Sequence, residues 1–227
     1  MSKPPQRQSR KRRATRRRIS DVATALFIAR GFDNVTVDEI AMAADVSRMT
    51  VFNHFARKED MFFDLDDEAR EDLMSALRNR SKGMSPIEAV RSFAHWAVEE
   101  RRPYVQFYAE GADKFLNAVR ASDALKSRAR AIRDELTDLL TSGLAEAAGC
   151  SLPDPSASLA ASLLVATWVV ASMEAHRVFS QTASVKKSNA AFLTLIDQGA
   201  SGAMTAVKGT RYSQATRSAA TKSTSHR

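Results

Sequence analysis

The sequence predicts an all-α protein of about nine helices, and three observations support that prediction. Apolar residues recur every three or four positions over most of the 227 residues, which is the spacing of one helix face. No segment sustains the alternation of apolar and polar residues that a half-buried strand requires. Glycine and proline number only 8 and 6, and aromatic residues make up 7%, too few for a β-sandwich or barrel with many tight turns.

The first helix is predicted over residues 19–30 by a single apolar stripe. The stripe has helical spacing and consists of Ile19, Val22, Ala23, Leu26 and Phe27. Gly31 follows at the position where a glycine commonly ends a helix in the left-handed conformation. We therefore expect the chain to turn at Gly31.

Two short helices are expected next, over about 37–44 and 47–54. Thr36 and Glu39 have the spacing of a capping box, in which each side chain bonds the backbone amide of the other residue. After a turn at Asp45-Val46, Ser47 can cap the second of these helices. Two short helices joined by such a turn have the helix-turn-helix geometry. Their small core is expected to contain Ala41, Ala44, Val46, Val51 and Phe55.

Six more helices are predicted in the remainder of the chain. They span about 58–80, 86–101, 104–119, 123–148, 155–180 and 185–207. Ser85 and Glu88 form a second capping box, with Pro86 at the first helical position. The helix over 155–180 is apolar on nearly every face, so we expect it to be buried. It fits either the interface of a homodimer, which we favour, or the centre of a monomer.

A run of about 45 residues matches a known family in order and spacing. The matching positions are Ile19, Leu26-Phe27, Gly31-Phe32, Val35-Thr36-Val37, Ile40-Ala41, Ala44-Asp45-Val46-Ser47, Thr50-Val51-Phe52-Asn53-His54-Phe55 and Lys58-Glu59. This stretch resembles the DNA-binding domain of the TetR-family transcriptional regulators. Two positions depart from the family. Asp45 stands where the family usually has glycine, and aspartate tolerates the left-handed conformation. Phe52 stands where the family usually has a tyrosine that bonds a phosphate.

The resemblance implies that one face of the helix over 47–54 enters the major groove of DNA. Residues expected to position the DNA backbone are Thr36, Ser47, Thr50, His54 and Lys58. Arg48 is expected to read a guanine, or else to bind a phosphate, and Asn53 is a second candidate, for an adenine. Met49 is expected to pack in the groove, and Phe52 lies on the same face.

Positive charge is concentrated at the two ends of the chain. Residues 1–18 hold nine Lys and Arg and residues 208–227 hold five, and neither segment holds an acidic residue. The ends therefore carry +14 and the rest about −6, within a total of +8. We expect both segments to be disordered, and the first to bind nucleic acid. A solubilising tail and an organelle transit peptide are the alternatives. No apolar stretch follows the basic residues, so a secretory signal is not expected, and we predict a cytoplasmic protein without a membrane-spanning helix.

The second half of the chain is expected to bind a small-molecule effector and to form a homodimer, as the resemblance implies. The residues favoured for the effector site are Trp96, Tyr104, Tyr108 and His176, since each combines an apolar body with a polar group. The alternative is that these side chains belong to an ordinary core. No metal or cofactor is expected, because Cys150 is the single cysteine and no carboxylate cluster accompanies the histidines.

The sequence thus divides into a basic arm over 1–18, a helix-turn-helix DNA-binding domain over 19–60, a ligand-binding and dimerisation bundle over 61–207, and a basic tail over 208–227. We predict a homodimeric transcriptional regulator, a repressor that an effector of unknown identity releases from a palindromic operator in double-stranded DNA. The alternative is an activator or an architectural DNA-binding protein without an effector. An enzyme is not expected, since no phosphate-binding glycine loop or paired carboxylate site is recognisable.

Overall fold

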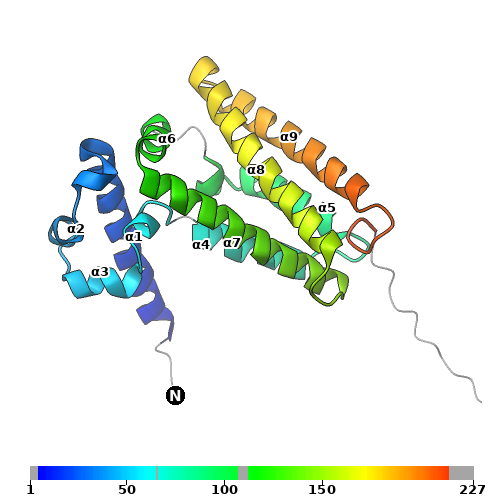
Figure 1. The fold of residues 1–227 in the computed structure, drawn as a ribbon, viewed down its shortest axis with the longest axis horizontal. Coiled ribbons are helices and arrows are strands. Elements are labelled where there is room, and N and C mark those ends of the chain that lie inside the picture. The colour runs from blue at the N-terminus through cyan, green and yellow to red at the C-terminus, as the bar shows by residue number, and fades with distance from the viewer. Residues whose placement is uncertain (1–4, 65, 107–111, 215–227) are drawn as a thin grey trace, which may run out of the picture. The chain divides into compact units, whose positions relative to one another are not determined.

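The computed structural model describes residues 5–64, 66–106 and 112–214, and in these ranges every regular element is a helix (Figure 1). The α-helices are α1 Pro5–Arg30, α2 Val37–Ala43, α3 Arg48–His54, α4 Asp66–Arg78, α5 Pro86–Glu99, α6 Ala112–Ala121, α7 Asp123–Ala148, α8 Pro155–Thr182 and α9 Val185–Ala206. Three 3-10 turns accompany them, η1 Phe32–Asn34, η2 Glu59–Met61 and η3 Pro103–Val105. The predicted all-α fold is confirmed.

Helix α1 begins at Pro5, so the prediction of a disordered arm over 1–18 is wrong from residue 5 onward. Pro5 suits the first turn of a helix, where its missing amide hydrogen is not needed. Residues 6–18 contain no glycine and no further proline, and they are rich in Arg, Lys and Gln, which are good helix formers. They continue directly into the amphipathic part of α1, which supplies the helical turns that an isolated basic segment would have to nucleate.

The first compact unit comprises residues 1–67 and 109–132, and its described helices are α1, α2, α3, α6 and the start of α7. Its core consists of Ile19, Ala23, Phe27, Phe32, Val35, Ile40, Ala41, Ala44, Val51, Phe55, Met61, Phe62 and Leu125. The predicted helix-turn-helix core is present, with Val46 only partly buried. Phe115 of α6 stacks on Phe62 with a centroid separation of 4.3 Å, so this unit also takes residues far beyond position 60.

Two predicted helices have other bounds in the structure. The predicted helix over 58–80 is divided into η2 and α4, and both Met61 and Phe62, at the end of η2, are buried. The predicted helix over 104–119 is replaced by η3 and α6, since Val105 ends the turn that Pro103 begins and is itself buried.

The second compact unit comprises residues 68–108 and 133–227, and its described helices are α4, α5, the rest of α7, α8 and α9. Helices α8 and α9 lie side by side along most of their length (Figure 1). At one point their backbones come very close, because a Cβ on Gly199 would lie 2.1 Å from Thr167 Oγ1. Glycine is therefore required at position 199 for this packing.

The apolar composition of α8 predicts burial on all sides, and this prediction is wrong. The structure buries one face of the helix and leaves the other exposed. Its inner face is built mainly from small residues, namely Ala157, Ala160, Ala161, Leu164, Val165, Ala171 and Ala175. Its outer face leaves Leu159, Leu163, Val169, Val170 and Met173 exposed at helical spacing. By length and composition alone α8 could cross a membrane, which is weak evidence because core helices of other proteins pass the same test.

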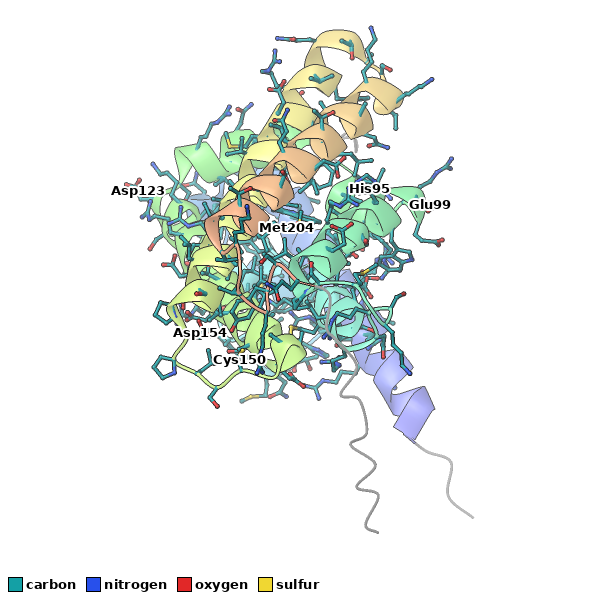
Figure 2. All side chains as sticks on the ribbon, turned by 90° about the vertical axis from the view of Figure 1, so that its right-hand side faces the viewer. His95, Glu99, Asp123, Cys150, Asp154 and Met204 are labelled. Carbon is teal, nitrogen blue, oxygen red and sulfur yellow. The ribbon has the colours of Figure 1, made fainter. Side chains whose placement is uncertain are left out.

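The structure describes the segment after α9 through residue 214, and for this part the prediction of disorder over 208–227 is wrong. Tyr212 is fully buried, and its hydroxyl donates a hydrogen bond to Asp154 Oδ2 at 2.7 Å. Arg211 donates to the carbonyl of Gly149 at 3.2 Å. Asp154 and Cys150 lie near each other in Figure 2, at the end of the bundle where this segment is attached.

Candidate DNA-binding interface

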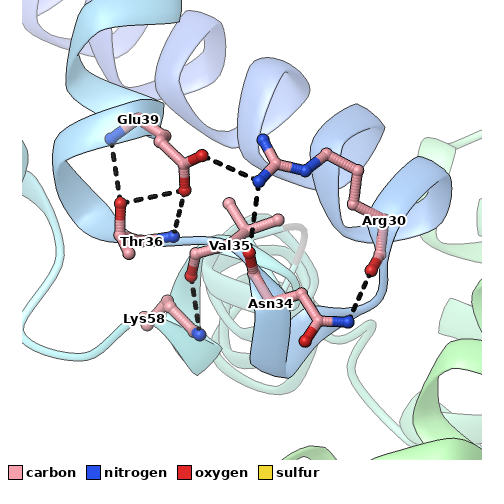
Figure 3. A network of polar contacts seen from close by, with 6 residues as sticks. All are labelled: Arg30, Asn34, Val35, Thr36, Glu39 and Lys58. Carbon is pink, nitrogen blue, oxygen red and sulfur yellow. Dashed lines mark hydrogen bonds and ion pairs between the residues drawn. The ribbon is translucent and has the colours of Figure 1, made fainter.

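The start of α2 is held by the predicted capping box (Figure 3). Thr36 Oγ1 accepts the amide of Glu39 at 3.2 Å, and Glu39 Oε2 accepts the amide of Thr36 at 2.8 Å. Arg30, at the end of α1, donates to Glu39 Oε1 at 2.8 Å. The Thr36 amide, followed by Arg30, lowers the pKa of Glu39 from 4.5 to about 2. This carboxylate is therefore ionised at neutral pH and joins α1 to α2.

The ammonium of Lys58 binds backbone carbonyls within the protein, whereas the resemblance implies that it contacts a phosphate. Its ammonium donates to the carbonyls of Phe32 at 2.8 Å and Val35 at 2.9 Å, and stands 4.1 Å from the centroid of the Phe32 ring. Figure 3 shows it reaching the loop that precedes Thr36. Two of the three ammonium donors are thus used to fix this loop, which leaves one for any phosphate.

The turn between α2 and α3 is left-handed at Asp45, the position where the family usually has glycine. Asp45 has φ of +51°, in the left-handed region, as predicted. The amide of Val46 donates to the carbonyl of Ala41 at 3.0 Å, and the amide of Asp45 donates to Met42 at 3.2 Å. These two bonds define a Schellman motif, the usual way in which a helix ends at a glycine. Aspartate therefore replaces glycine and the turn is kept.

Helix α3 presents apolar and polar side chains to solvent on one face. Ser47 caps it by accepting the amide of Thr50 at 3.0 Å, and the two hydroxyls lie 2.8 Å apart. Met49 is 68% exposed and Phe52 is 45% exposed. Asn53 is also exposed. Exposed large apolar side chains on a short capped helix indicate a contact surface for a partner.

Arg48 is exposed on the same face and already has an acidic partner. Its Nη1 lies 3.1 Å from Asp38 Oδ2, and its guanidinium lies 5.5 Å from the centroid of the Phe52 ring. Both members of the ion pair are mostly exposed, so the pair contributes little to stability. Arg48 can therefore leave Asp38 and bind a base or a phosphate at a small cost in free energy.

The end of α3 is tied to α1 by Arg16, a residue that the sequence did not single out. Arg16 Nε donates to Asp64 Oδ1 at 2.6 Å, and its Nη1 donates to the carbonyl of His54 at 2.5 Å. The guanidinium also lies 4.2 Å from the centroid of the Phe55 ring. Burial, followed by the nearby Arg12 and Arg16, lowers the pKa of His54. His54 is therefore neutral at pH 7.

Two further exposed features of the first unit lie outside the predicted residues. Met42 on α2 is 78% exposed. The sequence did not indicate this exposure, because Met42 is an apolar residue among alanines. The helical extension of α1 exposes five basic side chains, Lys11, Arg12, Arg13, Arg17 and Arg18. A run of exposed cations on a rigid helix suits a polyanion.

The residues predicted for an effector site are only partly brought together. Trp96 and Tyr104 each lie 6.1 Å from the Phe93 ring, between centroids. His176 lies on α8 two turns beyond Trp168, which itself stacks 5.8 Å from Phe93. Tyr108 lies outside the described residues. No group of three or more metal-binding side chains occurs in the part of the chain that the structure describes.

Helices α2 and α3, their Schellman turn and the exposed face of α3 define a helix-turn-helix DNA-binding domain. Residues 19–65 match the family model for bacterial regulatory proteins of the tetR family. Over these residues the chain has the DNA-binding domain of the tetR-family regulatory proteins.

Curated relatives match this chain over its N-terminal part. It is 36% identical to the HTH-type transcriptional regulator TcmR of Streptomyces glaucescens over 86 residues. The matched stretch makes up 38% of this chain and 38% of TcmR. It is 50% identical over 52 residues to the putative mycofactocin biosynthesis transcriptional regulator MftR of Mycobacterium tuberculosis, which is 23% of this chain and 26% of MftR. The matches thus span well under half the length of these relatives. Both relatives are named as regulators and not as enzymes.

Solved structures share the fold over most of the chain. SmeT, the repressor of the Stenotrophomonas maltophilia multidrug efflux pump SmeDEF, has a TM-score of 0.52 and 18% identity, over 82% of this chain and 89% of SmeT. A putative TetR-family regulator from Mesorhizobium loti MAFF303099 has a TM-score of 0.52 and 20% identity, over 86% of this chain and 97% of that protein. At such low identity these likenesses show the fold.

Proposed function

We propose that this protein is a homodimeric, sequence-specific transcriptional repressor that acts in the bacterial cytoplasm and is released from a palindromic operator by a small-molecule effector. The observation that carries the proposal is the exposed face of α3, where Arg48, Met49, Phe52 and Asn53 project from a helix capped by Ser47. Thr36, Ser47, Thr50 and His54 would position the DNA backbone, and Arg48 and Asn53 would read bases.

The exposed stripe on α8 supports the homodimer. Five large apolar side chains at helical spacing on one face leave a surface that a second copy would cover. Two recognition helices related by a two-fold axis read half-sites roughly 34–36 Å apart, which makes the operator a palindrome. An effector acts only if it binds one spacing of these helices better than the other.

An architectural DNA-binding protein is the second candidate, and one observation favours it. The exposed cations of α1 are part of the +14 charge of the chain ends, and such charge binds any DNA sequence. Under this alternative the face of α3 would contribute little discrimination between sequences.

The test is to select bound fragments from the source genome and to footprint them at physiological salt, with wild type and Arg48→Ala in parallel. A repressor protects a short palindrome, and Arg48→Ala costs about 1–3 kcal/mol while relaxing preference at one base pair of each half-site. Equal weakening on every sequence would make Arg48 a phosphate contact. Protection without sequence preference would reject the repressor and favour the architectural protein.

A further inference from the structure

The guanidinium of Arg102, just after α5, lies among acidic and aromatic side chains of the second unit. It forms ion pairs with Glu68 and with Asp72, the latter at 2.8 Å. It also lies 5.5 Å from the centroid of the Trp96 ring and 5.9 Å from that of Tyr104. We call these four partners, Glu68, Asp72, Trp96 and Tyr104, the Arg102 cage. Carboxylates combined with ring faces are what protein sites use to hold organic cations.

Part of the cage is held by contacts that do not involve Arg102, although Arg102 also bonds Tyr104. Tyr104 donates its hydroxyl to Asp72 Oδ2 at 2.8 Å, which fixes the ring and the carboxylate relative to each other. Burial, followed by this hydrogen bond, raises the pKa of Tyr104, so the hydroxyl stays protonated and neutral. Phe93 stacks between Tyr104 and Trp168, with centroid separations of 6.1 and 5.8 Å. The Tyr104 ring and the Asp72 carboxylate are therefore held in place by contacts other than those of Arg102.

Arg102 occupies the cage imperfectly. Its Nε is buried and has no hydrogen-bond partner among the described residues. A buried donor without a partner costs free energy. This unsatisfied donor lowers the cost of moving the Arg102 side chain out.

The cage is also reachable from solvent. Trp96 is 40% exposed and the side chain of Glu68 is 43% exposed, whereas that of Asp72 is 23% exposed. One edge of the cage is therefore open, with a large aromatic surface beside it. A ligand that carries its own ring can stack there, which the aliphatic stem of Arg102 cannot do.

We propose that the Arg102 cage is a binding site for organic cations whose charge is planar and delocalised, an amidinium or guanidinium on an aromatic body, and that Arg102 is its internal occupant. Glu68 and Asp72 select positive charge, and with Arg102 displaced the two carboxylates attract a cation more strongly. An anion has no attraction to this site, because the single positive charge of Arg102 is already matched by two carboxylates.

Binding would also replace the cation that pairs with the carboxylates of α4. This helix directly follows the DNA-binding domain in the chain. Glu68 and Asp72 lie in its first two turns, and they would pair with the ligand in place of Arg102. An effect of this exchange on operator binding rests on the proposed function. The binding of a cation does not.

Intrinsic fluorescence offers a specific measurement, because both tryptophans of the chain, Trp96 and Trp168, lie in this aromatic cluster. Benzamidinium chloride is titrated into the full-length protein without DNA, with benzyl alcohol as the uncharged probe of similar size. Wild type should bind benzamidinium saturably and benzyl alcohol at least ten times more weakly. Asp72→Asn, with Arg102 still present, should weaken benzamidinium at least tenfold.

The decisive variant is Arg102→Ala, which removes the internal occupant and should bind benzamidinium about ten times more tightly than wild type. Arg91→Ala is the matched control, since Arg91 also pairs with two carboxylates, Glu88 and Asp197, and should leave the affinity unchanged. Equal affinity for both probes, no gain in Arg102→Ala, or the same gain in Arg91→Ala would each overturn the proposal. If Arg102→Ala does not fold, the comparison of wild type with Asp72→Asn decides.

The proposed function is tested separately by operator binding with and without benzamidinium. Saturable binding of the cation together with unchanged operator affinity would leave the cage proposal standing and remove its regulatory consequence. Failure to bind any operator, with cation binding intact, would instead overturn the proposed function alone.

Discussion

The carboxylate of Glu39 is a single group that carries an interaction between two helices. Its pKa of about 2 lies below the ordinary 4.5, so the folded state favours the ionised form. The stabilisation is fully present above pH 4.5 and disappears as the pH falls toward 2. We predict that Glu39→Gln removes this acid-dependent destabilisation, so that its Tm changes less than that of wild type between pH 5 and pH 3.

Thermal unfolding followed by circular dichroism measures this difference. Glu146→Gln is the control, because Glu146 is exposed on α7 and carries no capping role. An equal drop in Tm for Glu39→Gln and wild type would show that the capping box does not cause the acid sensitivity.

Residues joined over short distances in the chain were predictable, and residues joined over long distances were not. The capping box at Thr36 and the left-handed turn at Asp45 follow from residue type at fixed spacing. The contact of Arg16 with Asp64 spans 48 positions, and that of Lys58 with the Phe32 carbonyl spans 26. No local pattern encodes such pairs, and whether the candidate residues of α3 read DNA stays a prediction.

At the scale of elements, the contact between α8 and α9 depends on a missing side chain. We predict that Gly199→Ala lowers the free energy of unfolding by about 1–3 kcal/mol, because its Cβ would overlap Thr167 and force the helices apart. Gly202→Ala, on the same helix, has nothing within 4 Å of its added Cβ and should stabilise by up to about 1 kcal/mol through helix propensity. Urea unfolding of the two variants gives the comparison, and the same sign for both would contradict the packing argument.

The basic extension of α1 is an element in which charge and helix propensity oppose each other. Its charge led to the prediction of disorder, whereas continuity with the amphipathic part of α1 makes it helical. We predict that deletion of residues 1–13, which retains Arg16, lowers DNA affinity and flattens the plot of log K against log salt. The slope should fall by about 0.9 for each phosphate that the shortened protein no longer neutralises. An unchanged slope in a fluorescence anisotropy titration would show that the extension does not bind DNA.

For the whole molecule, the proposed homodimer depends on the exposed stripe of α8. Trp168, at the centre of this apolar helix, packs on Phe192 with a centroid separation of 5.1 Å. It belongs to the interior, so a substitution there would not test the interface. We predict that Val170→Glu yields folded monomers by light scattering, since the charge would be buried at the interface. Leu152→Glu, at an exposed position outside the stripe, should remain dimeric. A dimeric Val170→Glu would move the interface elsewhere.

The burial of Tyr212 has a consequence for synthesis on the ribosome. The core of the second unit includes this residue, and its hydroxyl anchors Asp154 at the start of α8. Leu125 completes the core of the first unit in a comparable way, from a position well beyond the helix-turn-helix. Neither unit can therefore close its core as soon as its first helices leave the exit tunnel. The nascent chain must hold α8 and its apolar stripe in an unfinished bundle until residue 212 has emerged.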